Sequence, residues 1–246
     1  MAASTPEPES IPPETSEHLS PAGIPAALEL LDVETGKLLA TVSTLTDADL
    51  AEPSLCPGWT RGHVVSHLAR NAESLVRLVV WARTGVRTDQ YPSQASRDAD
   101  IEDGAPRPAQ EQEQDLRGSC DLVRDALAAL ALPLATHEIE MSSGPADPRA
   151  LPLRRLNEVV LHHLDLHAGF TLADAHPLAV ADLLELAVTR LDADPTAAAG
   201  TLISDEGDRY DVRGGGPEVR GPAAALLGWI TRGLTDDIRT REGRSR

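Results

Sequence analysis

The chain has 246 residues and a formal net charge of −17, from 39 acidic and 22 basic side chains. A surface this acidic repels phosphate backbones and anionic bilayers, so nucleic-acid binding and membrane docking are disfavoured. Aromatic residues make up only 2% of the chain. The core must therefore be built from Leu, Val, Ile and Ala, a composition that favours helices.

The N-terminal segment, residues 1–21, is rich in Pro, Glu and Ser and is expected to form a disordered tail. It lacks the basic region and apolar core of a signal peptide. No stretch of the sequence approaches the roughly 20 apolar residues that span a bilayer. We therefore expect a soluble, cytoplasmic protein that is a monomer or a small oligomer.

Hydrophobic residues at helical spacing predict four long helices, over residues 24–44, 61–84, 109–131 and 153–170. Thr60 is the expected N-cap of the second helix. Residues 47–59, 85–108 and 142–147 are expected to be connections. The stretch 85–108 is polar and unusually long, and connections of this length are often functional.

The C-terminal part of the sequence has a different pattern. Residues 177–191 are predicted to form a helix, residues 200–221 two or three short strands, and a last helix opens at Gly221-Pro222 and ends near residue 234. We thus expect a mainly α protein, with a four-helix bundle over residues 22–172 and a small α/β domain over residues 173–246.

Histidines and a glutamate on two of the predicted helices form a possible metal site. Glu158 and His162 are four residues apart, so both side chains can reach one ion from one helix face. His67 lies among apolar residues and is expected to point into the bundle. Two His and one carboxylate leave a coordination position open, as in catalytic zinc sites. Spacing alone also permits two other pairs, His63 with His67 and His163 with His167.

Three segments give the chain a resemblance to a known family: GWTRGHVVSHLARNAESLVRLVVWARTG, YPSQASRDADIEDGA and NEVVLHHLDLHAG. Together they resemble the mycothiol-dependent maleylpyruvate isomerases, which belong to the DinB-like metal-binding bundles. The resemblance extends from about Ile24 into the C-terminal module. Gly58-Trp59-Thr60-Arg61, His67, Asn71 and the run Glu158-x3-His162-x2-Asp165 occur in the order that the family has.

The resemblance implies roles for individual residues. His67, Glu158 and His162 match the family's zinc ligands, and Asp165 matches a position expected to orient a ligand imidazole. The family also has a functional arginine in its last helix, after an aromatic residue. When Trp229 is aligned with that aromatic residue, Arg232 comes one position early, so Arg232 is the candidate for contact with a carboxylate.

The function implied by the resemblance is a zinc- and mycothiol-dependent isomerisation of maleylpyruvate to fumarylpyruvate, a step of gentisate-type aromatic degradation. The partners would be mycothiol and a small dicarboxylate or other electrophile, and another divalent metal could replace zinc. One alternative is a mycothiol S-transferase acting on a different electrophile. A second is a non-catalytic zinc-binding regulatory module. Cys56 is expected to be a passive small side chain, because neither it nor Cys120 lies in a metal-binding spacing.

Overall fold

The computed structural model describes residues 23–142 and 144–241, and the chain separates into two compact units that divide after His167. The sequence placed this boundary five residues later, after residue 172. The tail predicted over residues 1–21 lies outside the described residues. Within the described part of the chain, no helix is long and apolar enough to cross a membrane.

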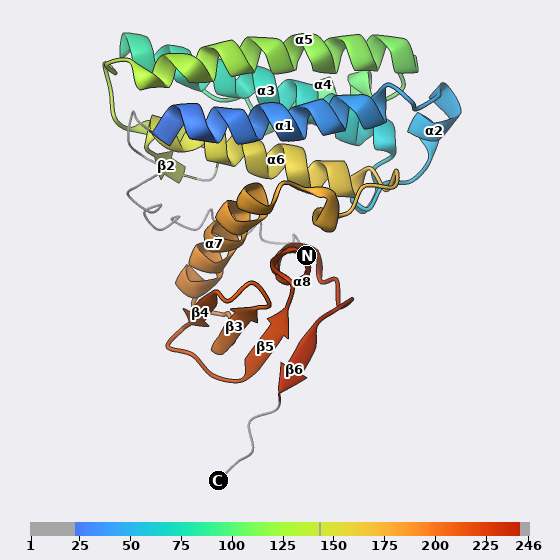
Figure 1. Ribbon diagram of the computed structural model, residues 1–246. Coiled ribbons are helices and arrows are strands. Elements are labelled where there is room, and N and C mark those ends of the chain that lie inside the picture. The colour runs from blue at the N-terminus through green and yellow to red at the C-terminus, as the bar shows by residue number, and fades with distance from the viewer. Residues whose placement is uncertain (1–22, 143, 242–246) are drawn as a thin grey trace, which may run out of the picture. The chain divides into compact units, whose positions relative to one another are not determined.

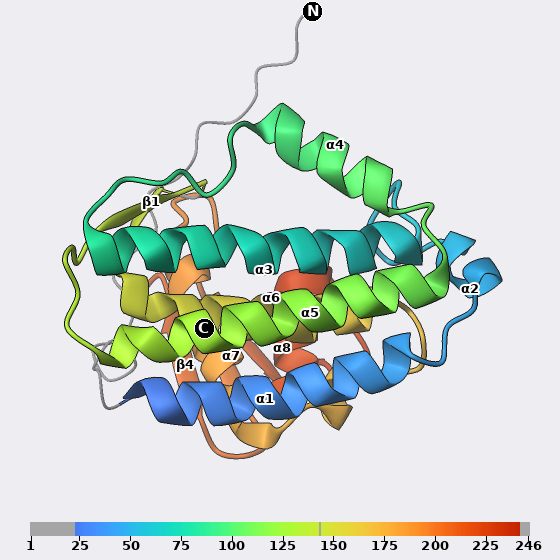
Figure 2. The ribbon, with the colours of Figure 1, turned by 90° about the horizontal axis from the view of Figure 1, so that it is seen from above.

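Four helices form the bundle of the first unit: α1 (Gly23–Val42), α3 (Arg61–Thr84), α5 (Ala109–Ala128) and α6 (Leu151–Asp165). Helices α1 and α3 each pack against both α5 and α6 (Figures 1 and 2). The four-helix bundle expected from the sequence is confirmed. Its core is aliphatic, as the composition required, and includes the buried residues Leu28, Leu31, Leu38, Leu68, Leu75, Leu78, Leu116, Leu127 and Leu156.

Helix α3 begins and ends at the residues that the sequence predicted. The Thr60 hydroxyl accepts a hydrogen bond from the backbone N–H of His63, and the His63 ring accepts one from the backbone N–H of Thr60, which forms a capping box. At the other end, Gly85 has a φ of 74°, a left-handed conformation that ends helices and favours glycine. These two ends fix the register of His67 within the bundle.

Regular structure also occurs where the sequence predicted no helix or strand: α2 (Asp47–Ala51), α4 (Gln94–Gly104), and an antiparallel pair of strands, β1 (Ile139–Met141) and β2 (Gly144–Ala146). Helix α4 packs against α3 (Figure 2). The backbones of α3 and of the residue that follows α4 lie close together, because a Cβ atom on Gly62 of α3 would overlap the carbonyl oxygen of Ala105.

Two of the predicted helices were too long. The third ends at Ala128 and continues as one turn of 3-10 helix, η1 (Ala129–Ala131). The fourth, α6, ends at Asp165 rather than at residue 170, and it follows a second 3-10 turn, η2 (Pro148–Ala150). His167 has a φ of 51°, so the chain has already left the helix there. The apolar residues that follow α6 were wrongly included in it.

Up to residue 241, where the described part of the chain ends, the second unit contains η3 (Leu172–Asp174), α7 (Pro177–Ala193), α8 (Ala223–Arg232) and four strands. The strands β3 (Gly200–Ser204), β4 (Arg209–Val212), β5 (Glu218–Gly221) and β6 (Arg239–Arg241) form one sheet in the order β4-β3-β5-β6. The β3–β5 pair is parallel and the other two pairs are antiparallel. The small α/β part is confirmed, although the sequence missed β6 and placed Pro222 inside α8 rather than before it.

Candidate metal centre

Three side chains from two helices of the bundle converge on one point. His67 projects from α3, and Glu158 and His162 project from successive turns of α6. One ligand atom from each lies within 4.8 Å of the other two. His67 Nε2 is 2.9 Å and His162 Nε2 3.5 Å from the same oxygen, Glu158 Oε2. We call these three residues the triad.

The donor atoms of the triad match what a tetrahedral zinc site needs. Zinc bonds to nitrogen and oxygen at about 2.0–2.1 Å, which places neighbouring tetrahedral ligand atoms about 3.3 Å apart. The two nitrogen–oxygen separations of 2.9 and 3.5 Å lie on either side of this value. His67 is buried, whereas the side chain of Glu158 is 29% exposed. The residues therefore fit a divalent ion held on three sides by protein and accessible on the fourth.

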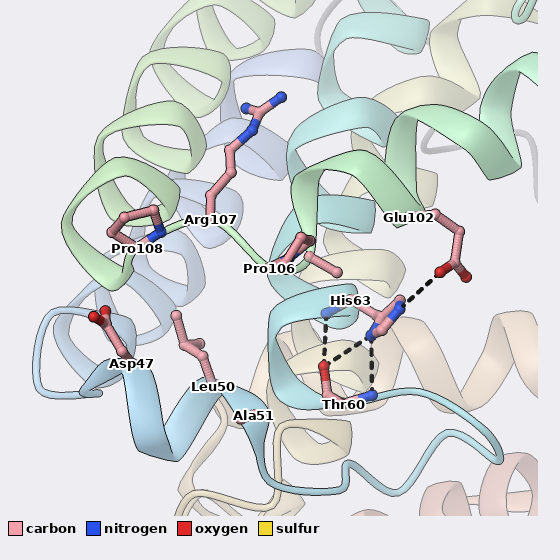
Figure 3. Close-up of a pocket in the computed structure, with 10 residues that line it drawn as sticks. Asp47, Leu50, Ala51, Thr60, His63, Glu102, Pro106, Arg107 and Pro108 are labelled. Atoms are coloured by element: carbon pink, nitrogen blue, oxygen red, sulfur yellow. Dashed lines mark hydrogen bonds and ion pairs between the residues drawn. The ribbon is translucent and has the colours of Figure 1, made fainter.

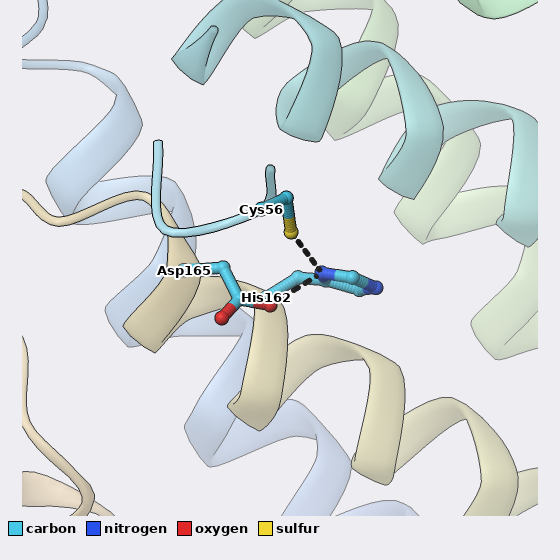
Figure 4. Close-up of side chains that lie close together, drawn as sticks. All are labelled: Cys56, His162 and Asp165. Atoms are coloured by element: carbon cyan, nitrogen blue, oxygen red, sulfur yellow. Dashed lines mark hydrogen bonds and ion pairs between the residues drawn. The ribbon is translucent and has the colours of Figure 1, made fainter. Parts of the chain in front are cut away.

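The far side of the His162 ring faces two further groups. Asp165, fully buried one turn later on α6, has its Oδ2 2.9 Å from His162 Nδ1. Cys56 Sγ lies 4.0 Å from the same nitrogen (Figure 4). A carboxylate at Nδ1 keeps the proton there and leaves the lone pair of Nε2 for a metal. The arrangement matches the orienting role expected of Asp165.

Cys56 belongs to the loop between α2 and α3, whose fold brings it to the triad. Its backbone N–H donates to Ser54 Oγ, its carbonyl accepts from the N–H of Trp59, and Pro53 and Thr60 form an isolated β-bridge. Cys56, His162 and Asp165 thus form a second group of potential metal-binding atoms that shares His162 with the triad. Spacing could not reveal this neighbour, because 106 residues separate Cys56 from His162.

The other ring nitrogen of His67 faces an arginine that the sequence did not single out. Arg97, on α4, places its Nη2 3.2 Å from His67 Nδ1. Trp59 covers the same histidine, with ring centroids 5.5 Å apart, and also stacks on His63. Arg97 lies in one of the segments that carry the family resemblance, but the helix α4 was not expected from the apolar pattern, so its contact with His67 could not be foreseen.

Burial and hydrogen bonds shift the pKa of each of the three triad residues. Burial alone would raise the pKa of Glu158, but hydrogen bonds from His162 and His67 outweigh it and hold that pKa well below its ordinary value. Burial would likewise lower the pKa of His162, but the contacts with Asp165 and Cys56 prevail and raise it well above its ordinary value. Burial lowers the pKa of His67. Without metal, the favoured state near neutral pH is an ionised Glu158 beside a protonated His162 and a neutral His67.

The histidines of the two alternative pairs lie elsewhere. His163 is buried on another side of α6, with Nε2 2.7 Å from Thr41 Oγ1. His167 lies beyond the end of α6. His63 caps α3 and has its Nε2 3.3 Å from Glu102 Oε2. Among the described residues, the three triad residues form a group of potential metal ligands, and His63, His163 and His167 belong to no such group of three or more.

His63 instead lines a separate cavity of about 500 Å³ (Figure 3). The cavity lies between α2, the start of α3 and the segment that joins α4 to α5, and it contains both acidic and basic groups, among them Asp47, Glu102 and Arg107. Such a mixed lining suits a ligand with several hydroxyl or charged groups.

A buried arginine connects the two helices that carry the triad. Arg155 of α6 is 1% exposed and donates to the carbonyl of Leu68 and to Oδ1 of Asn71, both on α3. Asn71 lies one turn after His67, and Arg155 about one turn before Glu158. These hydrogen bonds therefore hold the two ligand-bearing turns in register.

Arg232, the candidate for contact with a carboxylate, is the last residue of α8 in the second unit. Its Nη1 donates to the carbonyl of Thr231, and Gly233 ends the helix with a φ of 66°. A cation at this position also interacts favourably with the helix dipole.

Comparison with known proteins identifies similarity along most of the chain. The family model described as the mycothiol maleylpyruvate isomerase N-terminal domain matches residues 31–167. The chain is similar to the crystal structures of a mycothiol-dependent maleylpyruvate isomerase and of its histidine-to-alanine mutant. In both cases the TM-score is 0.80 and the identity 24%, over 91% of this chain and 95% of the other. The structural likeness shows the fold. A search among curated proteins finds no match.

Proposed function

The chain belongs to the mycothiol maleylpyruvate isomerase family, and from this premise we propose that it is a zinc-dependent enzyme that uses mycothiol to isomerise maleylpyruvate to fumarylpyruvate. The observation that best supports the proposal is the convergence of His67, Glu158 and His162 within 4.8 Å. Three protein ligands with an accessible fourth side are the pattern of a catalytic rather than a structural zinc site.

In this proposal the triad holds the metal and its neighbours set the state of the ligands. A bound zinc ion lowers the pKa of a thiol that reaches it, so that the thiol is a thiolate near neutral pH. Asp165 Oδ2 accepts the Nδ1–H of His162, which fixes the ring orientation and the tautomer. Arg155, through Leu68 and Asn71, keeps α3 and α6 at the spacing that the ligands need.

The reaction requires only that the thiolate add and leave again. Its sulfur forms a bond to one carbon of the cis double bond, and the electron pair of that double bond moves toward the adjacent carbonyl. The former double bond is then single and can rotate. When the electron pair returns, the carbon–sulfur bond breaks, the double bond re-forms in the trans geometry and the thiolate is regenerated.

The protein must also neutralise the carboxylates of the substrate during this rotation. We propose Arg232 for one such contact, because a planar guanidinium binds a carboxylate through two parallel hydrogen bonds. No protein cysteine takes part in this scheme. Cys56 lies beside the nitrogen of His162 that faces away from Glu158.

The deciding experiment is a spectrophotometric assay of zinc-loaded protein with maleylpyruvate, with and without mycothiol. Formation of fumarylpyruvate that depends on mycothiol, without net consumption of the thiol, is the expected result. Absence of turnover in protein that holds about one metal per chain would contradict the isomerase. The next assay would then test the same site as a thiol S-transferase, by measuring thiol consumption against a panel of electrophiles.

A further inference from the structure

The contact between Arg97 and His67 is chemically inconsistent with a metal on His67. A neutral imidazole has one N–H and one lone pair. In the structure, Arg97 Nη2 lies 3.2 Å from His67 Nδ1, and Glu158 Oε2 lies 2.9 Å from His67 Nε2. Because the guanidinium can only donate and the carboxylate can only accept, His67 must carry its proton on Nε2 and its lone pair on Nδ1.

A metal in the triad reverses this assignment. The nitrogen of His67 that faces Glu158 is Nε2, so an ion in the triad would take the lone pair of Nε2 and the proton would move to Nδ1. An Nδ1–H cannot accept a hydrogen bond from Arg97, and two donors facing each other at 3.2 Å repel. Metal binding and the contact between Arg97 and His67 therefore exclude each other.

The surroundings of Arg97 keep the guanidinium close to the triad after that contact breaks. Its Nη1 pairs with Asp98, a neighbouring side chain that is 55% exposed, and such surface pairs are weak. The guanidinium also stacks on the ring of Tyr91, with 5.8 Å from Cζ to the ring centroid. Arg97 itself is 21% exposed. A partly shielded cation beside an open metal position is suited to bind an anion.

We propose that Arg97 binds a carboxylate of the electrophilic substrate, and that metal binding to His67 releases it for this role. The inference rests on the proposed function, because that function supplies the dicarboxylate. A dianionic substrate needs a cation for its carboxylates beyond the ion that the triad would hold, and the side chain of Arg97 contacts the triad at His67. Arg97 thereby couples the metal site to recognition of the substrate.

The test uses maleate, a cis-dicarboxylate, as the probe in the absence of mycothiol, with the full-length protein in zinc-loaded and zinc-free forms. Calorimetry should show maleate binding that is at least about tenfold tighter to the zinc-loaded protein. Arg97→Gln should weaken binding to the zinc-loaded form by about 10- to 100-fold, as expected for loss of a hydrogen-bonded charge. Arg97→Lys should keep part of the affinity for maleate that Arg97→Gln loses, and zinc stoichiometry should stay unchanged in both variants.

The matched control is Arg117→Gln, which removes an exposed arginine of α5 that pairs with Glu113. It should bind maleate as the wild type does. In the assay, Arg97→Gln should raise KM for maleylpyruvate at least about tenfold and leave KM for mycothiol unchanged. Nitrogen-15 spectra of the His67 ring should show the proton on Nε2 without zinc and on Nδ1 with zinc.

The possible failures are distinguishable. Turnover with unchanged maleate affinity and KM in Arg97→Gln would overturn the role of Arg97 and leave the isomerase proposal intact. Maleate binding that depends on Arg97, without turnover, would support the role and refute the isomerase. A wild-type protein that binds maleate equally with and without zinc would overturn the coupling.

Discussion

At the scale of single residues, we predict that the histidines of the triad are required for metal binding and for activity. Replacing His67 or His162 by Ala removes one of three protein ligands, so neither variant should retain zinc through purification and both should be inactive. Metal content by mass spectrometry and the isomerase assay measure the two effects. Replacing His163, which contacts Thr41, provides the control: His163→Gln should keep its metal. Full activity with metal retained in either triad variant would refute the assignment.

Asp165 tests whether the carboxylate behind His162 matters to the metal. Asp165→Asn keeps the shape of the side chain but removes the charge that holds the Nδ1 proton, 2.9 Å away. We expect the Kd for zinc to rise roughly 10- to 100-fold. Competition against a chromophoric chelator measures it, with Asp121→Asn on the exposed face of α5 as the control. An unchanged Kd would reduce Asp165 to a purely structural residue.

The raised pKa of His162 predicts that zinc binding releases a proton. This imidazole is protonated near neutral pH in the metal-free protein, and its Nε2 must lose the proton to bind zinc. His67, whose pKa is lowered by burial, is already neutral and adds none. Calorimetry in buffers of different ionisation enthalpy should show about one proton released per zinc at pH 7. Zinc binding without proton release would contradict the charge state.

The raised pKa of His162 also determines how the folding stability of the metal-free protein depends on pH. Because the pKa of His162 is higher in the folded state than the ordinary 6.5, its protonation stabilises the fold fully below that value. The contribution is lost as the pH rises through the raised pKa. The lowered pKa of Glu158 acts in the opposite range: it stabilises the fold above the ordinary 4.5 and is lost as the pH falls through the lowered value.

At the scale of elements, the packing of α4 on α3 depends on glycine. A Cβ on Gly62 would overlap the backbone carbonyl of Ala105, which cannot turn aside as a side chain can. Gly62→Ala should therefore lower the free energy of unfolding by roughly 1–3 kcal/mol and displace α4. Gly118→Ala, at an exposed position of α5 where a Cβ meets nothing, should raise it by roughly 0.5–1 kcal/mol. Urea unfolding measures both, and equal effects would contradict the close approach.

Elements with strong end signals and a long apolar face were predictable from the sequence. Thr60 and Gly85 bound α3 at both ends, and the buried leucines between them follow a helical period. Helix α4 lacks such a face, because Ile101 is its one large buried hydrophobic residue. Strands β1, β2 and β6 have three residues each, which is too short for a period of two to be visible. The end of α6 was missed because the apolar pattern continues past Asp165.

At the scale of the whole molecule, spacing along one helix suggested Glu158 with His162, and the apolar neighbours of His67 suggested that it joins them. The resemblance favoured this set over the two alternative pairs. Asp165 was inferred from the resemblance, but the places of Cys56 and Arg97 beside the triad were not. Cys56 comes from a loop 106 residues away from His162. Arg97 lies in a segment that carried the family resemblance, but in a helix that the apolar pattern did not predict. Local patterns determine the elements, whereas these contacts depend on how the elements pack.

The division into two units leads to the prediction for Arg232. All residues of the triad belong to the first unit and Arg232 belongs to the second. Arg232→Gln should therefore leave zinc affinity unchanged and raise KM for maleylpyruvate about tenfold or more, as expected for a lost charged hydrogen bond. Metal titration and steady-state kinetics measure the two effects, with Arg213→Gln, an exposed arginine of the same unit, as the control. An unchanged KM would remove Arg232 from the site.

The triad and the groups beside it come from different elements of the fold, which allows the two sets of residues to change independently during evolution. Two long bundle helices hold the proposed metal ligands, and their spacing is set by buried contacts such as that of Arg155 with Asn71. The groups beside the ligands, Cys56, Trp59 and Arg97, come from a loop and from the separate helix α4. Under the proposed function, descendants of one ancestor can exchange the loop and α4, and with them their choice of electrophile, while the metal chemistry of the two long helices is inherited unchanged.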